Sequence, residues 1–160
     1  MAEKLDMRKA EEVYKTLIRM LDGIDWNYDR DDDKLLIKSG VKGDDFPVEF
    51  IVVVQPKQEV VQFLSTLPFK MPEDKRIDGA VATSVVNYRL VHGSFDYDMR
   101  DGRIIFRMTS SYRDSKISEE LLEYTIMVSA ATVDDYNDKL FMLSKGMITL
   151  DDFIKKVEAD

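Results

Sequence analysis

The sequence predicts an α+β fold in which helices pack against a twisted antiparallel sheet. Apolar residues recur at helical spacing near both ends of the 160-residue chain. Between them lie stretches in which apolar and polar residues alternate, and one of these folds back on itself around its own turn. Because the strands follow one another through short turns, neighbouring strands are expected to run antiparallel.

The first helix is expected over Lys4–Leu21, and Gly23 suits its C-terminal end. Strands are expected next over Ile24–Tyr28 and Leu35–Lys38, separated by an acidic turn at 31–33. The apolar positions that define the helix recur every three or four residues: Ala10, Val13, Tyr14, Leu17, Ile18 and Leu21.

The middle of the chain predicts the centre of the sheet and a second helix. Val48–Gln55 is apolar on both alternating faces, which predicts a central strand covered on both sides. Val60–Leu67 follows as an antiparallel strand, with a short helix as the alternative. Pro72 suits the first position of a helix, although Gly79 weakens it. The apolar face of that helix is Ile77, Val81, Val85 and Tyr88.

The clearest local signal is a hairpin around Asp101-Gly102, a pair typical of a two-residue type I′ turn. This turn places Asp96 opposite Arg107 on one side of the hairpin. On the other side it forms three apolar pairs: Met99 with Ile104, Tyr97 with Phe106, and Phe95 with Met108.

Two helices are expected to complete the chain. Ser118 suits the N-cap of a long helix over Glu119–Leu143, and Gly146 ends it. Thr149 and Asp152 resemble a capping box for a short last helix, about Leu150–Val157.

Composition excludes several classes of protein. The chain has no cysteine, which removes disulfides and thiolate chemistry. Its formal net charge of −8 disfavours binding to nucleic acid. The N-terminus has no apolar signal core, and no apolar run approaches the length of a membrane span. We therefore expect a cytoplasmic protein that binds neither nucleic acid nor membrane.

Catalytic and metal-binding patterns are weak. The triplet Asp29, Asp31 and Asp33 resembles the start of a calcium loop, but Lys34 and Gly40 stand where that loop needs Gly and Glu. His92 is the one histidine, and no nucleophile elbow or phosphate-binding loop accompanies it. We expect no metal and no cofactor. A hydrolase using paired carboxylates stays open, because carboxylates are abundant: Asp96, Asp98, Asp134, Asp135, Asp138, Asp151 and Asp152 among them.

Two features indicate a partner-binding surface. Arg103 and Arg107 share the polar face of the hairpin, where they are either a solvated strand face or a dock for an acidic partner. The third helix is apolar nearly all round, so one side exceeds what the sheet needs. That surplus is covered by another helix of this chain or by a second subunit, and its residues are Leu121, Tyr124, Met127, Val128 and Ala131.

The segment Asn87–Gly146 resembles the YbjN family, which is described as bacterial sensory transduction regulators. The N-terminal helix followed by Ile24 and Trp26 also fits. The matching residues are Asn87, Gly93-Ser94-Phe95, Asp98, Gly102-Arg103-Ile104, Arg107, Ile117-Ser118-Glu119-Glu120, Tyr136 and Lys145-Gly146. The resemblance implies a fold similar to type III secretion chaperones, which are commonly dimeric and hold an extended segment of another protein. It brings no catalytic residues.

We therefore expect residues 1–146 to form one YbjN-like α+β domain, with residues 147–160 as a helical extension packed on it. The expected function is that of a non-enzymatic protein-binding module, a chaperone-like or regulatory adaptor. It would bind a segment of another protein and form a homodimer. The alternatives are the acidic hydrolase and a sensor with a cavity for an apolar ligand.

Overall fold

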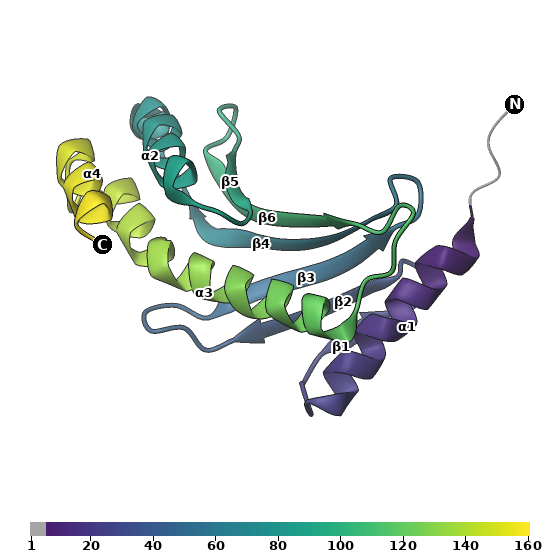
Figure 1. Cartoon of the computed structure of the whole chain (residues 1–160). Coiled ribbons are helices and arrows are strands. Elements are labelled where there is room, and N and C mark those ends of the chain that lie inside the picture. The colour runs from purple at the N-terminus through teal and green to yellow at the C-terminus, as the bar shows by residue number, and fades with distance from the viewer. Residues whose placement is uncertain (1–5) are drawn as a thin grey trace, which may run out of the picture.

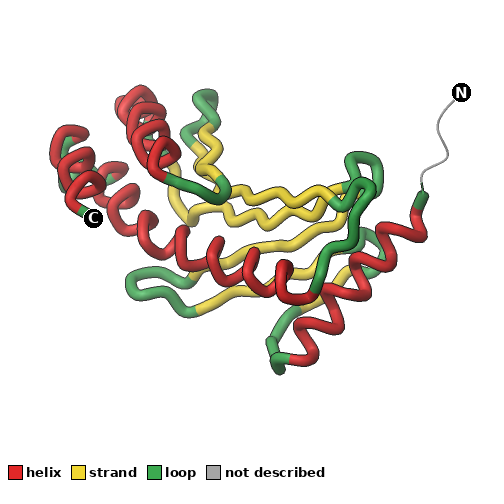
Figure 2. The backbone as a smooth tube through the Cα atoms, in the orientation of Figure 1, coloured by secondary structure: helices red, strands yellow, loops and turns green. Residues whose placement is uncertain are grey.

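The computed structural model describes residues 6–160, which fold into two layers. A six-stranded antiparallel sheet forms one layer, and helices form the other (Figures 1 and 2). The helices are α1 (Met7–Gly23), α2 (Arg76–Arg89), α3 (Glu119–Ser144) and α4 (Leu150–Ala159), with a 3₁₀ turn η1 (Glu73–Lys75) before α2. The strands are β1 (Asp29–Asp31), β2 (Leu36–Val41), β3 (Val48–Gln55), β4 (Val60–Lys70), β5 (Ser94–Tyr97) and β6 (Arg103–Ser111). The α+β class and the antiparallel sheet are confirmed.

The strand order is β1-β2-β3-β4-β6-β5. The long strands β3, β4 and β6 lie at the centre, and the short strands β1 and β5 form the two edges. The chain leaves the sheet after β4 and returns through α2 at the far edge. Strand β6 then inserts between β5 and β4. None of the helices in residues 6–160 combines the length and the apolar composition needed to cross a bilayer.

The core lies on one face of the sheet only. Along β3, Phe50 and Val52 are buried, whereas Ile51 and Val53, between and beyond them, are half-exposed. The prediction that this strand is covered on both sides is wrong, because α1, α2 and α3 pack on the same face. Side chains on the other face form a second apolar group outside the core.

The first helix begins at Met7, where the Asp6 carboxylate caps it by accepting from the amide of Arg8. The start predicted at Lys4 lies outside the described residues. The strand predicted over Ile24–Tyr28 is wrong, because Trp26 and Tyr28 pack against the core from an irregular segment.

Helix α2 forms, but it begins at Arg76, after the 3₁₀ turn, and not at Pro72 as predicted. It also buries the face opposite to the one predicted. Its buried residues are Gly79, Ala82, Thr83 and Val86. Of the predicted apolar face, Ile77, Val81 and Tyr88 are exposed, whereas Val85 packs against the core. A Cβ at position 79 would lie 2.6 Å from both Met71 Cγ and Tyr97 Oη, so Gly79 is what allows α2 to approach. Gly79, which was expected to weaken the helix, is therefore the residue at which α2 packs most closely against Met71 and Tyr97.

The hairpin is present, but its turn is Met99–Gly102 and its register differs by two residues from the prediction. Phe95 pairs with Phe106 and Tyr97 with Ile104. A shift of two keeps every side chain on its predicted face, because side chains alternate with a period of two. The longer turn is stabilised by local polar contacts. The Asp98 carboxylate accepts from the Arg100 amide at 2.9 Å, and Gly102 adopts a φ of +78°.

The two C-terminal helices match the predictions. Ser118 caps α3 by accepting from the amide of Leu121, and Thr149 with Asp152 forms the expected capping box of α4. Phe153 and Val157 of α4 are fully buried, and α4 contacts α2 and α3.

Candidate protein-binding surfaces

The residues singled out for chemistry lie in separate parts of the structure. Asp96 and Asp98 line one hollow at the hairpin, Asp135 lines another beside Asp160, and Asp151 pairs with Lys155 at 2.9 Å. Asp31 pairs with Lys34 Nζ at 3.4 Å, and the carboxylate of Asp32 binds Arg30 at 2.7 Å. Within residues 6–160, no group of three or more His, Cys, Asp or Glu side chains is arranged to hold a metal ion. His92 Nε2 lies 3.1 Å from the hydroxyl of Tyr124, at the surface.

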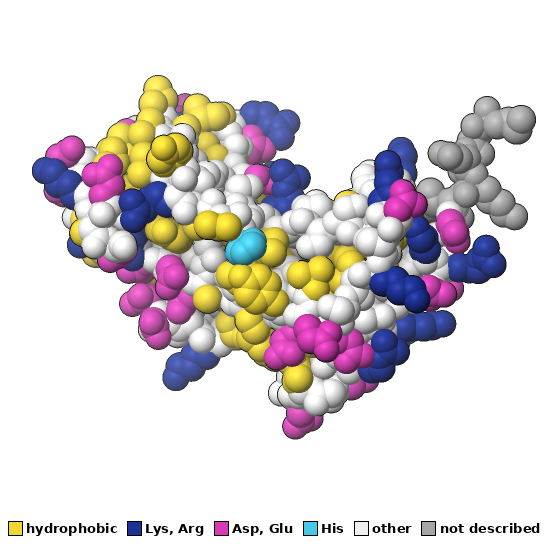
Figure 3. Space-filling view, in the orientation of Figure 1, with side chains coloured by type: hydrophobic (Ala, Val, Ile, Leu, Met, Phe, Trp, Pro, Cys, Tyr) yellow, Lys and Arg dark blue, Asp and Glu magenta, His cyan; other side chains and the backbone are white. Residues whose placement is uncertain are grey.

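The first candidate surface lies on α3. Leu121, Tyr124 and Met127 are between 41% and 49% exposed. Ala131 is also exposed, whereas Val128 packs partly against the core. The opposite side of α3 packs on the sheet, and α1 contacts α3 along another side. Part of the surplus apolar surface is thus covered internally, and the rest forms a half-exposed stripe around His92 (Figure 3).

The two arginines of the hairpin lie on the other side of the sheet. Along β6, Arg103 and Arg107 alternate with Ile104, Phe106 and Met108, which are buried beneath the helices. Arg107 Nε forms the expected ion pair with Asp96, at 3.0 Å. The arginines and the α3 stripe therefore face opposite directions.

The face that carries the arginines is not covered by any helix of residues 6–160, and we call it the open face. A shallow trough of about 610 Å³ runs over part of this face, and its lining includes Ile51, Leu64 and Ile105 together with Asp29, Lys38 and Glu49. The apolar residues of the open face lie side by side across the strands. They are Leu36, Ile51, Val53, Leu64 and Ile105, and all are partly exposed. None belongs to the core cluster. Apolar residues in this arrangement are typical of a surface that binds another chain.

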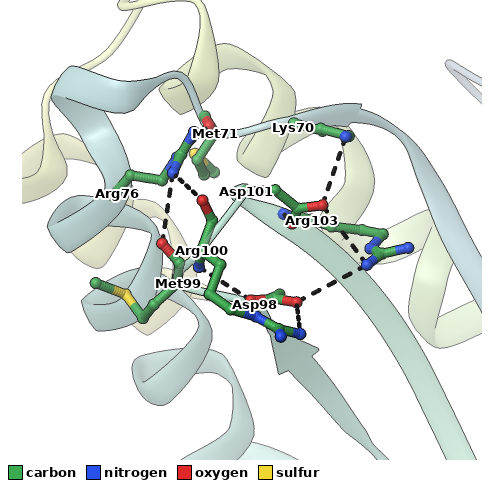
Figure 4. Close-up of polar contacts among 8 residues, drawn as sticks. All are labelled: Lys70, Met71, Arg76, Asp98, Met99, Arg100, Asp101 and Arg103. Carbon is green, nitrogen blue, oxygen red and sulfur yellow. Dashed lines mark hydrogen bonds and ion pairs between the residues drawn. The ribbon is translucent and has the colours of Figure 1, made fainter.

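One end of the open face is basic, and we call it the hairpin corner (Figure 4). Arg76 lies at the start of α2 and donates to the carbonyls of Met71 at 3.1 Å and Arg100 at 2.8 Å, which fixes the turn. The corner comprises Lys70, Arg76, Arg100, Arg103 and Arg107 with Asp96, Asp98 and Asp101.

Two carboxylates of the corner, Asp98 and Asp101, are held in their charged form. The side chain of Arg100, followed by its backbone amide, keeps the pKa of Asp98 well below its usual range. The backbone amide of Arg103 lowers the pKa of Asp101. Both groups stay ionised at neutral pH, so the corner carries fixed charges of both signs.

Sequence reasoning missed a third surface, on α2. Ile77 is 72% exposed, Tyr88 93% and Val91 90%, and Val81 lies between them on the same side. Figure 3 shows hydrophobic side chains gathered over this helix. The spacing of these residues predicted a helical face, but not which face. The signal that could have oriented the helix is the small residues Gly79 and Ala82, which allow close packing.

Asn87 links α2 to the open sheet edge. Its Oδ1 accepts from the amide of Phe95 at 2.7 Å, and its Nδ2 donates to the carbonyl of Phe95 at 3.0 Å. One side chain thus satisfies both polar groups of a residue in β5. This residue begins the segment in which the family resemblance was found, and its role is to position β5.

Comparison with known proteins agrees with this geometry. The sequence profile of the YbjN family, described as "Putative bacterial sensory transduction regulator", matches residues 14–142. The chain belongs to the YbjN family. The match runs from α1 to near the end of α3 and includes the residues of the α3 stripe, the open face, the hairpin corner and the α2 surface, whereas α4 lies beyond it. Among curated protein sequences, none matches the chain.

Solved structures share the fold at low sequence identity. The crystal structure of YbjN from E. coli, called a putative transcription regulator, has a TM-score of 0.62 at 12% identity and covers 82% of this chain and 92% of its own. The HopA1–SchA chaperone–effector complex gives 0.57 at 12%, covering 84% and 99%. The ExsC–ExsE complex gives 0.53 at 10%, covering 82% and 95%. The type III secretion chaperone-like fold predicted from the sequence is confirmed.

Proposed function

We propose that this protein is a non-enzymatic binding module, of chaperone or regulatory-adaptor type, that holds a segment of a partner protein on its open face. The observation that carries the proposal is the row of partly exposed apolar residues on the side of the sheet away from the helices. Five such side chains lie outside the core cluster of residues 6–160. Two of the similar solved structures are described as complexes, one of them between a chaperone and an effector, which supports a protein as the ligand.

The face of the sheet is a better binding site than its edges. Adding a strand to an edge requires a run of free backbone groups. Here the edge strands are only Asp29–Asp31 and Ser94–Tyr97. Short edge strands are a common protection against such pairing. The α3 stripe remains a second, smaller contact surface in this proposal.

The test uses a displayed library of random 15-residue peptides, selected on the immobilised protein. We expect the selected peptides to bind Leu64→Glu at least tenfold more weakly, because the substitution puts a charge where a leucine contributes about 1.5–3 kcal/mol of apolar burial. Met147→Glu is the matched control, since Met147 is an exposed apolar residue in the loop between α3 and α4. Peptides that bind Leu64→Glu as well as the wild type would refute the open face as the site.

We further propose that the α2 surface binds a second copy of the chain. Ile77, Val81 and Tyr88 recur along one side of a helix about 21 Å long, given a rise of 1.5 Å per residue. Such a stripe can pack against itself across a twofold axis, so that Ile77 of one copy meets Tyr88 of the other. A single aromatic side chain such as Tyr88 can bury about 150–250 Å².

Light scattering coupled to size exclusion tests the dimer. We expect the wild type to have twice the mass of the chain and Tyr88→Glu to be monomeric. Met127→Glu, on the α3 stripe, is expected to stay dimeric and so separates the two apolar surfaces. A monomeric wild type at concentrations of roughly 100 μM, a range in which weak association is visible, would refute the proposal.

A further inference from the structure

We propose that the partner segment on the open face is acidic: it combines apolar side chains with Asp or Glu, and its carboxylates bind at the hairpin corner. This inference rests on the proposed function and adds the chemistry of the segment. It is carried by the local charge, by the unused hydrogen-bonding capacity of the corner, and by the continuity of the corner with the apolar trough.

The hairpin corner has the opposite charge to the rest of the chain. The whole sequence has 31 acidic against 23 basic residues. At the corner, five cations surround three carboxylates. Figure 4 shows Lys70, Arg76, Arg100 and Arg103 around Asp98 and Asp101. Arg76 has only carbonyl partners among the described residues, so no carboxylate of residues 6–160 neutralises it. An acidic ligand would therefore be attracted to this corner and repelled by most of the remaining surface.

Two cations of the corner are paired without being saturated. Arg103 Nη2 lies 3.8 Å from Asp98 and 3.5 Å from Asp101, and Lys70 Nζ lies 3.6 Å from Asp101. Charge-assisted hydrogen bonds are typically about 2.7–2.9 Å long. A guanidinium has five N–H donors, so Arg103 can bind an incoming carboxylate through two of them while keeping its neighbours. Arg100, whose side chain is 88% exposed, lies beside it.

The basic corner and the apolar trough form one continuous surface. Ile105 lines both the trough and a smaller hollow of about 350 Å³ that reaches Arg100 and Arg103. The register places Ile51 next to Leu64 and Leu64 next to Arg107, in one row across three strands. At roughly 4.8 Å between strands, the row from Ile51 to Arg107 is about 10 Å long. A short segment can therefore bury apolar side chains on the trough and place a carboxylate at the corner.

The same selection of 15-residue peptides tests this inference. Peptides selected by the wild type are expected to be enriched in Asp and Glu. Arg103→Glu is expected to weaken the binding of these peptides about tenfold, because it replaces an attraction by a repulsion. A selection on immobilised Arg103→Glu is expected to yield peptides enriched in Lys and Arg. Lys57→Glu, in the turn between β3 and β4, is the control with the same charge change and is expected to have no effect.

The design separates failure of the inference from failure of the proposed function. One possible result is that the selected peptides lose binding in Leu64→Glu and yet show no enrichment in Asp and Glu and bind equally at 50 mM and 500 mM salt. That result would overturn the inference that the segment is acidic, and the open face would still be the binding site. A single-stranded oligonucleotide that binds the wild type and is lost in Arg103→Glu would also overturn it, since the corner would then serve nucleic acid. Arg103→Gln avoids adding a carboxylate beside Asp98 and Asp101, and it should still weaken the peptides about threefold. Thermal unfolding of each variant verifies that it folds.

Discussion

Gly79 determines how closely α2 approaches the sheet, and replacing it by alanine tests that packing. In a solvent-exposed helix, the change from glycine to alanine stabilises by about 1 kcal/mol. Here the added Cβ would lie 2.6 Å from both Met71 Cγ and Tyr97 Oη, closer than such contacts normally are. The Tyr97 hydroxyl also donates to the carbonyl of Arg76 at 2.7 Å, so it cannot move without weakening that hydrogen bond.

The magnitude follows from these opposing contributions. Overpacking a well-filled site costs about 1–3 kcal/mol, and a weakened hydrogen bond costs about 0.5–1.5 kcal/mol more. After the gain in helix propensity, Gly79→Ala is expected to lower the free energy of unfolding by about 1–3 kcal/mol. For a domain of this size, each kcal/mol lowers Tm by roughly 2–4 °C.

Urea unfolding followed by circular dichroism measures the effect, and Gly23→Ala is the matched control. Gly23 is also helical, its φ is not positive, and a Cβ there would meet nothing within 4 Å. The control is therefore expected to be neutral or slightly stabilising. If Gly79→Ala stabilises the protein as Gly23→Ala does, α2 is not packed as closely as described. Close packing at Gly79 would then no longer explain why Ile77, Val81 and Tyr88 are exposed.

Three further predictions concern the hairpin corner and the core tyrosine. The folded-state pKa of Asp98 and of Asp101 lies below the usual value. The stability that these carboxylates provide is therefore present above about pH 4 and is lost as pH falls through their folded-state pKa values. In Asp98→Asn, the midpoint of urea unfolding should fall less steeply below pH ~4 than in the wild type, and an unchanged pH profile would contradict this. Arg76→Ala should accelerate hydrogen exchange of the Met99–Gly102 amides by roughly fivefold or more, because the turn loses its charged donor, whereas amides of β3 should not change. Burial, followed by the hydrogen bond to Asp32, raises the pKa of Tyr14 to about 12. The stability that Tyr14 provides is thus present below about pH 10 and is lost as pH rises towards the folded value; spectrophotometric titration should show a late phenolate step that Tyr14→Phe removes.

Periodicity predicted the elements well where one face of an element is apolar and the other polar. The hairpin shows what periodicity leaves open. A register shifted by two residues keeps Phe95 and Tyr97 on the same face, so the apolar pattern cannot distinguish the two registers. The choice depends on the Asp98 carboxylate and on Arg76, and Arg76 is contributed by a helix that precedes the hairpin in the chain. A contact between distant segments cannot be deduced from local spacing.

The sequence predicted the position of some surface residues and not of others. The alternation along β6 correctly placed Arg103 and Arg107 on one face, and the N-cap of α3 fixed the position of its exposed stripe. The apolar run of β3 looked like a strand buried on both sides, because a run of isoleucine and valine has the same pattern whether helices or a partner cover its second face. For this reason the sequence alone predicted a buried strand where the structure has the open face.

The two proposed interactions are compatible, because the stripe on α2 and the open face are formed by different sides of the molecule. In the dimer proposed above, Ile77 of one copy meets Tyr88 of the other, so the two Arg76 side chains lie at opposite ends of the paired helices. At a rise of 1.5 Å per residue their separation is roughly 20 Å. This exceeds the screening length of about 8 Å at physiological ionic strength, so the charges of the two hairpin corners act almost independently. Binding of an acidic segment and dimerisation should therefore be nearly independent, and Tyr88→Glu is expected to bind the selected peptides as the wild type does.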